Sequence, residues 1–332
     1  MTPGRLVALG LVLLVGAFAL WVYPSDQYIF LPDSAHLVDP LVTVAGAHTP
    51  KDGGGIYYVD VIVRKATLLE KIFGGLHEGA DLQTPSSVVP PGVSDAQRQE
   101  VDRRQMKQSQ QIAAAVALRA AGRKVTTAPT GALVTDIVAG SPAVGKLQPT
   151  DVIVAIDGKQ VRTPAEVTAA MSTKHVGDAI SVTVRRGATA KVVHMTTVSA
   201  GLGSKRAVIG VFIDQAFRIH LPIRVSIDSG DVGGPSAGLA FALDVLEKLG
   251  RDVDHGHKIA ATGEIFLNGS IGPIGGIKQK TIGARKAGVD AFLVPAGENS
   301  RDARKYAHGL RIIPVKSFQQ ALRALATLPT TA

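Results

Sequence analysis

The chain has 332 residues, of which 45% are hydrophobic and 19% charged, with a formal net charge of +9 and no cysteine. The apolar fraction is high enough for packed cores and excludes a disordered chain, and the lack of cysteine excludes disulfides, thiolate nucleophiles and Cys-ligated metals. The basic residues are scattered and their densest group, at 103–107, holds no aromatic residue, so we expect no nucleic-acid partner and take the charge as suited to an anionic membrane surface.

The N-terminal segment is a candidate membrane anchor. After Arg5, every residue at positions 6–23 is apolar or small. This is the lower end of the length that spans a bilayer. Trp21 and Tyr23 stand at the end of the run, where interfacial aromatic residues belong.

The alternative for this segment is a cleaved signal peptide, because the small residues at 17 and 19 suit a cleavage site. The apolar run continues beyond that site, which favours retention. We therefore expect a transmembrane anchor over residues 1–24. The positive-inside rule then places the N-terminus in the cytoplasm and the body outside it, at the cell membrane.

Residues 25–124 are predicted to form a hairpin and a long helix. Alternation in GIYYVDVIVRKA, at 55–66, indicates a strand, which we expect to pair with 37–46 across the turn HTPKDGGG. The segment at 96–121 has no proline and no glycine, and ends before Gly122, as a helix does.

The next region contains, in order, a strand at 132–138, the turn GSPA, the segment LQPTDVIVAIDGKQV and a helix capped by Thr163. This skeleton resembles that of bacterial PDZ domains, and we expect such a domain over 125–199. PDZ domains bind extended peptides by adding a strand to a sheet edge. The resemblance places this edge on the strand at 132–138, and the expected peptide-binding residues are Gly131, Ala132, Leu133 and Val134. A spacer role, or one in contacts between subunits, is the alternative.

The remaining region alternates strands and helices. Within it, DVGGPSAGLAFALDVLEKLG, at 231–250, is a glycine-rich turn that opens onto an apolar helix, with Ser236 at the junction. A phosphate loop is excluded because no G-x-x-x-x-G-K-[ST] is present. A helix cap is the ordinary role of such a serine. However, the N–H groups of a helix start are also the components of an oxyanion hole, so a nucleophile is the third interpretation.

A nucleophilic serine needs a base. GPSAG fits the turn of Ser-His-Asp hydrolases, but Pro235 fixes φ directly before the serine and little chain follows to build such a fold. A lysine can act instead if burial removes its proton. On a helix that starts near Ile277, Lys280 lies on the apolar face, whereas Lys278 lies on a face with other cations. Lys280 is therefore the candidate base.

The segments GGPSAGLAFALDVL, ATGEIFLNGSIGPIGGIKQKTIGARKAG and FLVPAGENSRD resemble, in order and spacing, the proteolytic domain of Lon proteases. That family uses a Ser-Lys dyad. The resemblance places the serine on Ser236, the lysine on Lys280, and the threonine that orients the lysine on Thr262. It also implies an oxyanion hole from the backbone of Gly233, Gly234, Pro235 and Ser236.

The sequence departs from the ATP-dependent members of that family. Gly233 stands where they usually have an acidic residue, Arg224 where they have a histidine, and the chain has no Walker motif. The resemblance implies an α+β fold of the ribosomal protein S5 domain 2-like type, with the Lon-type domain over 200–330. We expect the PDZ domain to be inserted into a split protease domain, whose first part is the hairpin and long helix at 25–124.

Together these features predict an ATP-independent serine endopeptidase that cleaves exported or membrane-associated proteins. The alternatives are a PDZ scaffold with a silent protease domain and a Ser-His-Asp hydrolase. No cofactor is expected, and no metal, since the pair His255 and His257 lacks a third ligand. Polypeptide substrates are the expected partners, and the resemblance implies a homo-oligomer.

Overall fold

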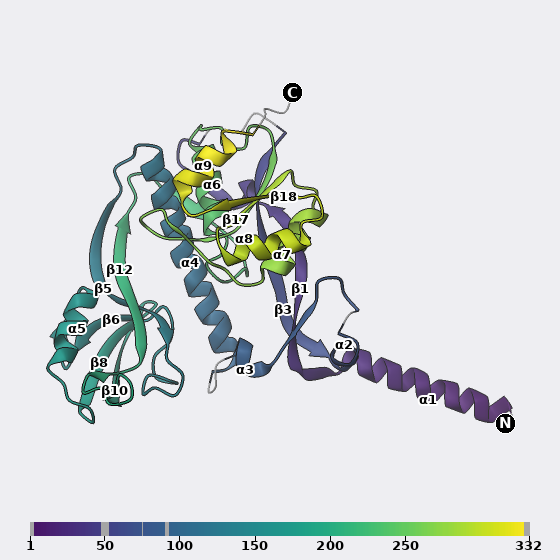
Figure 1. Ribbon diagram of the computed structural model, residues 1–332, viewed down its shortest axis with the longest axis horizontal. Helices are drawn as coiled ribbons and strands as arrows, with labels where there is room; N and C mark the ends of the chain where they lie inside the picture. The colour runs from purple at the N-terminus through teal and green to yellow at the C-terminus, as the bar shows by residue number, and fades with distance from the viewer. Residues whose placement is uncertain (1–2, 48–52, 75, 90–92, 329–332) are drawn as a thin grey trace. The chain divides into compact units, whose positions relative to one another are not determined.

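The computed structural model describes residues 3–47, 53–74, 76–89 and 93–328. The chain forms two compact units (Figure 1). The first unit consists of residues 1–90, 226–228 and 236–332, and the second of residues 91–225 and 229–235. The chain thus leaves the first unit after residue 90, belongs to it again at 226–228, and returns to it from residue 236 onward. The domain boundaries inferred from the sequence stay predictions. The sequence assigns the long helix to the first part of the protease domain, whereas the structure groups it with the second unit.

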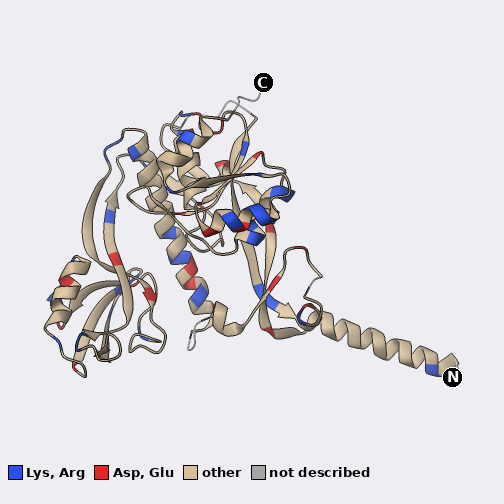
Figure 2. Cartoon of the chain, in the orientation of Figure 1, with Lys and Arg blue, Asp and Glu red and all other residues tan. Residues whose placement is uncertain are grey.

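The first unit begins with helix α1 (Pro3–Val22), the one helix in the described residues that is long and apolar enough to cross a membrane. One basic residue near its start is its only charge (Figure 2). Tyr23 follows the helix, and strand β1 (Pro24–Leu37) begins at once.

The main sheet of the first unit has the strand order β18-β17-β14-β3-β1-β4. Its strands are β3 (Gly55–Thr67), β4 (Asp81–Gln83), β14 (Lys258–Ala261), β17 (Ala291–Pro295) and β18 (Arg311–Val315). Strand β14 runs parallel to both β3 and β17, whereas β1 is antiparallel to β3 and β4. The C-terminal end of β14 therefore lies between parallel neighbours, where open sheets of this kind form their sites.

The hairpin predicted from the sequence is wrong in its first strand. Strand β3 pairs with β1, and β2 (Val42–Val44) pairs instead with β13 (Val225–Ile227). Proline does not separate the two candidate strands, because β1 contains Pro24 and Pro32 while the predicted strand at 37–46 contains Pro40. The pairing shifts register just after Pro32. The first five residues of the predicted turn, 48–52, lie outside the described residues.

Helices cover both faces of this sheet. The ring of Tyr58 lies 6.2 Å from that of Phe241 on α6 (Gly238–Lys248), while its neighbour Val59 shares a core cluster with Ile277 of α7 (Ile277–Lys286). Because successive strand residues point to opposite faces, α6 and α7 lie on opposite sides of β3. The smaller elements are α2 (Leu68–Ile72), α3 (Pro85–Val88), β15 (Glu264–Ile265), β16 (Ile271–Gly272), α8 (Glu298–Tyr306) and α9 (Phe318–Leu325).

The second unit combines a long helix with a second sheet. Helix α4 (Asp95–Ala120) is capped by Ser94. The sheet has the order β12-β5-β6-β8-β9, and its elements are β5 (Thr126–Ile137), β6 (Val152–Ile156), β7 (Lys159–Gln160), β8 (Ala179–Arg186), β9 (Thr189–Thr196) and β12 (Val211–His220). Two short strands, β10 (Val198–Ser199) and β11 (Ala207–Val208), pair beside it. Helix α5 (Pro164–Ser172) begins at Thr163, whose hydroxyl accepts a bond from the Glu166 N–H, so the cap predicted from the sequence is confirmed.

One buried carboxyl on α6 predicts a pH-dependent stability. Asp244 is only 2% exposed, and burial raises its pKa from 3.8 to about 7. The folded state therefore binds the proton of the Asp244 carboxyl more tightly than the unfolded state does. The stability that this proton contributes is full below about pH 4 and is lost by about pH 7. We expect the free energy of unfolding of the parent chain to fall, relative to that of Asp244→Asn, by up to about 4 kcal/mol over this range.

Denaturant unfolding of both proteins between pH 4 and 8 measures this difference. Asp302→Asn on α8, where the carboxylate is partly exposed and paired with Lys305, is the matched control and should track the parent chain. A difference between the parent and Asp244→Asn that stays constant with pH would show that Asp244 is ionised throughout.

Candidate functional site

Ser236 lies immediately before α6. The N-cap of that helix is Ala237, and no side chain bonds to the helix start. The interpretation of Ser236 as a helix cap is therefore wrong. The backbone of Ser236 is instead fixed by its carbonyl oxygen, which accepts bonds from the Gly263 N–H at 2.8 Å and from the Thr262 hydroxyl at 3.1 Å. Its side chain is left available for other contacts.

Lys280 lies on the buried face of α7. The helix starts after Gly276, whose φ of 68° is a left-handed conformation and whose Cβ, if present, would lie 2.7 Å from Val61 Cγ2. Only glycine suits that position. The Lys280 side chain is 4% exposed. By contrast, Lys278 makes an ion pair with Asp81 at 2.7 Å and is partly exposed, as its sequence position predicts.

The structure brings Ser236, Thr262 and Lys280 together. Lys280 Nζ donates to Ser236 Oγ at 2.6 Å and to Thr262 Oγ1 at 3.4 Å. Thr262 directly follows β14, so its hydroxyl joins the lysine amine to the serine backbone. A serine hydroxyl, an amine and an orienting hydroxyl within hydrogen-bond reach form the constellation of an activated nucleophile.

The proton affinity of Lys280 is set by burial and by one carboxylate. Burial lowers the pKa of Lys280 from 10.5 to about 8, and the charge of Asp60 on β3 acts in the opposite direction. Burial and the nearby Asp33 in turn raise the pKa of Asp60. An amine with a pKa near 8 is neutral often enough to accept a proton from a serine at physiological pH. The role of Asp60 was not predicted from the sequence. The signal that could have indicated it is a single carboxylate within the apolar strand GIYYVDVIV.

The residues predicted to form the oxyanion hole do not all have a free donor. The Gly234 N–H donates to the Asp102 carbonyl at 2.9 Å, and a Cβ on Gly233 would lie 2.8 Å from Asp102 Cβ. Proline has no N–H, so Pro235 cannot donate either. Within the described part of the chain, the N–H of Ser236 meets no acceptor. The prediction is therefore corrected for Gly234 and Pro235, which offer no available donor here, while Gly233 and Ser236 stay predicted donors.

The predicted peptide-binding edge is also corrected. Residues Gly131, Ala132, Leu133 and Val134 lie on β5, which pairs with β12 on one side and with β6 on the other. Ala132, for example, lies opposite both Gln215 and Ile153. Strand β12 lies beyond the region that the sequence assigned to the PDZ domain, so its pairing was not foreseen. The outer strand on this side of the described sheet is β12.

Two clusters of side chains have the spacing of metal ligands. One is Asp33, His36 and Asp60, and the other is Glu247, Asp252 and Asp254. In the first, His36 Nε2 already lies 3.3 Å from Asp33 and 3.7 Å from Asp60. Acidic groups often approach one another in this way without an ion, so we assign no metal to either cluster.

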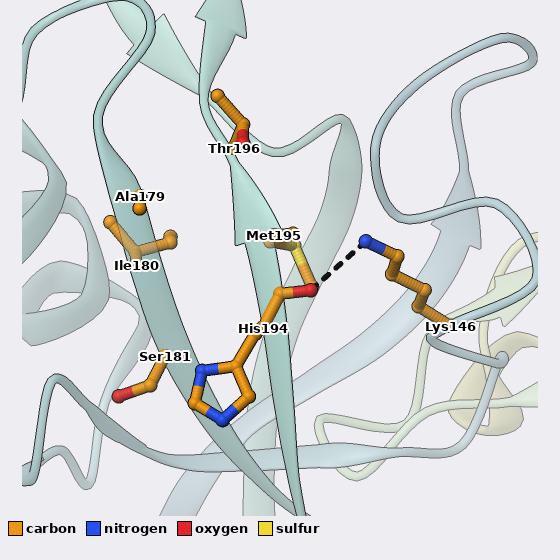
Figure 3. Close-up of a pocket in the computed structure, with 7 residues that line it drawn as sticks. All are labelled: Lys146, Ala179, Ile180, Ser181, His194, Met195 and Thr196. Atoms are coloured by element: carbon orange, nitrogen blue, oxygen red, sulfur yellow. Dashed lines mark hydrogen bonds between the residues drawn. The ribbon is translucent and has the colours of Figure 1, made fainter.

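The second unit also has a hollow between β8 and β9, lined by Lys146, Ala179, Ile180, Ser181, His194, Met195 and Thr196 (Figure 3). Lys146 Nζ donates to the His194 carbonyl at 2.9 Å. Ser181 and His194 are cross-strand neighbours, but the nearby Asp157 accepts bonds from Ser181 and not from the histidine. This is not the order of a Ser-His-Asp triad, and the hollow is no candidate active site.

Comparisons with known proteins match two regions of the chain. Residues 192–327 match the family model of the Lon protease (S16) C-terminal proteolytic domain, and residues 100–197 match that of the PDZ domain. The chain therefore contains a Lon-type proteolytic domain and a PDZ domain.

Two curated relatives illustrate the likeness. Lon protease 2 of Bacillus subtilis is 29% identical over 211 residues, and Lon protease of Chloroflexus aggregans is 36% identical over 127 residues. These regions cover 63% and 36% of this chain, but only 35% and 15% of the two relatives. Among solved structures, the PDZ domain of an SdrC-like protein from Listeria monocytogenes is 21% identical, with a TM-score of 0.24 over 25% of this chain and 87% of that one.

Proposed function

We propose that this chain is an ATP-independent, membrane-anchored serine endopeptidase that cleaves exported or membrane-associated polypeptides with a Ser-Lys dyad. The observation that carries the proposal is the 2.6 Å hydrogen bond between the Lys280 amine and the Ser236 hydroxyl. The lysine is buried and the serine is only partly covered, so the base is shielded from water while the nucleophile can meet a substrate. An intact pair of this kind argues against a silent scaffold.

The geometry supports a two-step acyl transfer. Neutral Lys280 takes the proton of Ser236 Oγ as the oxygen attacks the scissile carbonyl, and the resulting alkoxide is stabilised by the Ser236 N–H. Lys280 then gives the proton to the leaving amine, which departs and leaves an ester on Ser236. Lys280 next takes a proton from water as the water oxygen attacks the ester, and returns that proton to Ser236 Oγ as the acid leaves. Thr262 holds the amine in place throughout.

The PDZ domain would present extended substrate segments to the enzyme. Strand addition needs a sheet edge, and on this side of the sheet that edge is β12. Phe212 and Phe217 on β12 are 61% and 43% exposed, so their rings are available to a bound strand. We therefore place peptide binding on β12 in this proposal.

Cleavage of an unfolded protein tests the proposal. The full chain in detergent, without nucleotide, should convert casein to peptides at internal bonds, and Ser236→Ala should not. Thr262→Val, which keeps the shape but removes the hydroxyl, should lower the rate while leaving some activity, because its role is to position the lysine. Equal cleavage by the parent chain and Ser236→Ala would refute the assignment.

The dyad predicts a pH profile. Because the neutral form of Lys280 is the base and its pKa is about 8, we expect kcat/KM to fall about tenfold per pH unit below pH 8. Asp60→Asn removes a charge that favours the protonated lysine, so this acid limb should move to lower pH. A fluorogenic peptide assayed from pH 5 to 10 measures both.

The control for this profile is Asp81→Asn, because Asp81 pairs with Lys278 rather than with Lys280. Its acid limb should coincide with that of the parent chain. A flat profile, or an acid limb that moves to higher pH in Asp60→Asn, would contradict the role given to Lys280.

A further inference from the structure

An exposed apolar patch lies at the end of α2. Ile72, Phe73 and Leu76 are 60%, 57% and 52% exposed, although all three are large and apolar. Single exposed apolar residues are ordinary, but a group of them in one short segment marks a surface that meets something apolar. None of the three belongs to the site described above. We call them the α2 patch.

The α2 patch is close to the end of the candidate membrane helix. The Leu68 N–H, at the start of α2, donates to the Tyr23 carbonyl at 3.0 Å, and α2 packs against α1. Pro24 and Thr67 are paired at the same end of the β1–β3 ladder. Trp21 and Tyr23, at this end of α1, are 65% and 64% exposed. The exposed rings of Trp21 and Tyr23 and the α2 patch therefore lie at the same end of the first unit, where α1 leads into β1.

The orientation of α2 is fixed by an ion pair whose carboxylate is buried. Arg64 donates to both carboxylate oxygens of Glu70, at 2.8 Å and 2.6 Å, and the Thr67 N–H donates to the same carboxylate. Glu70 is 5% exposed, and the Arg64 hydrogen bonds contribute most to lowering its pKa to about 2. The helix is thus held against β3 by a strong, two-pronged contact, and its apolar end cannot turn inward without breaking it.

Basic side chains border the α2 patch. Lys71 is exposed and pairs with Asp26 on β1 at 2.6 Å. Lys65 and Arg64, the latter paired with Glu70, are also exposed, on β3. Lysine and arginine near a membrane surface are attracted to anionic headgroups. Apolar side chains with a basic border are the composition of a segment that lies in the bilayer interface.

We propose that the α2 patch inserts into the interfacial layer of the bilayer that α1 crosses, beside the end of α1 that leads into β1. Lipid is what the α2 patch contacts, because the patch lies beside the end of α1, where that helix leaves the membrane, and because basic side chains border the patch. The inference rests on the membrane anchoring in the proposed function. This insertion gives the first unit a second membrane contact. The second contact limits the rotation that a single anchoring helix and a one-residue connection would allow.

The test uses the full chain in phosphatidylcholine–phosphatidylglycerol vesicles. Trp21 is the only tryptophan, so Trp21→Phe gives a dark background in which Phe73→Trp reports on the patch. We expect a blue-shifted emission that lipids brominated near the headgroup quench strongly. Leu37→Trp in the same background is the control: Leu37 ends β1, far along the strand from α1, so brominated lipid should leave its emission unquenched.

Other outcomes overturn the inference in distinguishable ways. If the protein floats with the vesicles but Phe73→Trp emits as in water, the anchor stands and the α2 patch does not touch lipid. A blue-shifted emission that brominated lipid leaves unquenched would mean that a second copy or another protein covers the patch. If the protein does not float with the vesicles at all, the anchoring itself fails, whether or not casein is still cleaved.

Discussion

Replacing Lys280 by methionine should abolish peptide cleavage, with kcat/KM reduced at least about 10⁴-fold. Methionine fills the space of the lysine stem but has no amine, so Ser236 loses the base 2.6 Å from its hydroxyl. Lys280→Arg should be equally inactive, because a guanidinium stays protonated and cannot accept the serine proton. Ser236→Ala should cause a loss of the same size. The double variant should be no worse, because the two residues act as one unit.

The matched control is Lys278→Met, which removes the lysine two positions away on the same helix. That amine pairs with Asp81 at 2.7 Å and contributes nothing to the proposed chemistry. Its kcat/KM should stay within a few-fold of the parent value. Activity that survives in Lys280→Met but disappears in Lys278→Met would transfer the role of base to the other lysine.

Gly283→Ala should destabilise the first unit strongly and remove its activity. A Cβ at Gly283 would lie 1.9 Å from the Asp33 carbonyl oxygen on β1, which is backbone and cannot rotate away. Alanine favours a helix over glycine by about 1 kcal/mol. Forced overpacking costs about 3 kcal/mol and at times more, so the clash outweighs this gain. Because Lys280 lies one turn earlier on the same helix, moving α7 away from β1 also displaces the amine from Ser236.

Thermal unfolding and the kcat/KM of the soluble fraction measure the two effects. The control is Gly275→Ala, just before α7, where an added Cβ meets nothing within 4 Å. This variant should unfold near the temperature of the parent chain and keep its activity. A Gly283→Ala protein as stable and as active as the parent would show that α7 and β1 are not packed as described.

Much of the site could be predicted from local patterns. Helical spacing distinguishes Lys280 from Lys278, because it puts Lys280 among apolar residues and Lys278 among charged ones, and burial follows directly from that spacing. The long helix and the cap at Thr163 rest on equally local signals, and both are present in the structure. The resemblance to Lon proteases then connected Ser236, Thr262 and Lys280 across the chain.

What sequence reasoning missed depends on contacts between distant segments. Strand β12 pairs with β5, and β1 rather than β2 pairs with β3. Packing between segments that are distant in the sequence decides both pairings, so no local sequence pattern indicates them. The Gly234 N–H is taken by a carbonyl of α4, more than a hundred residues earlier in the chain. Asp60 affects the pKa of Lys280 only because β3 and α7 lie close together in the folded unit.

The central claim is that Ser236 is a nucleophile activated by Lys280, and acylation tests it most directly. A peptidyl β-lactone opens when a nucleophilic oxygen attacks its carbonyl, and leaves an ester that intact-mass and peptide mapping can locate. We predict one adduct per chain, on Ser236, formed faster as the pH rises through about 8, the pKa of Lys280, and absent from Lys280→Met. An adduct on another residue, or labelling of Ser236 at the parent rate in Lys280→Met, would contradict the account.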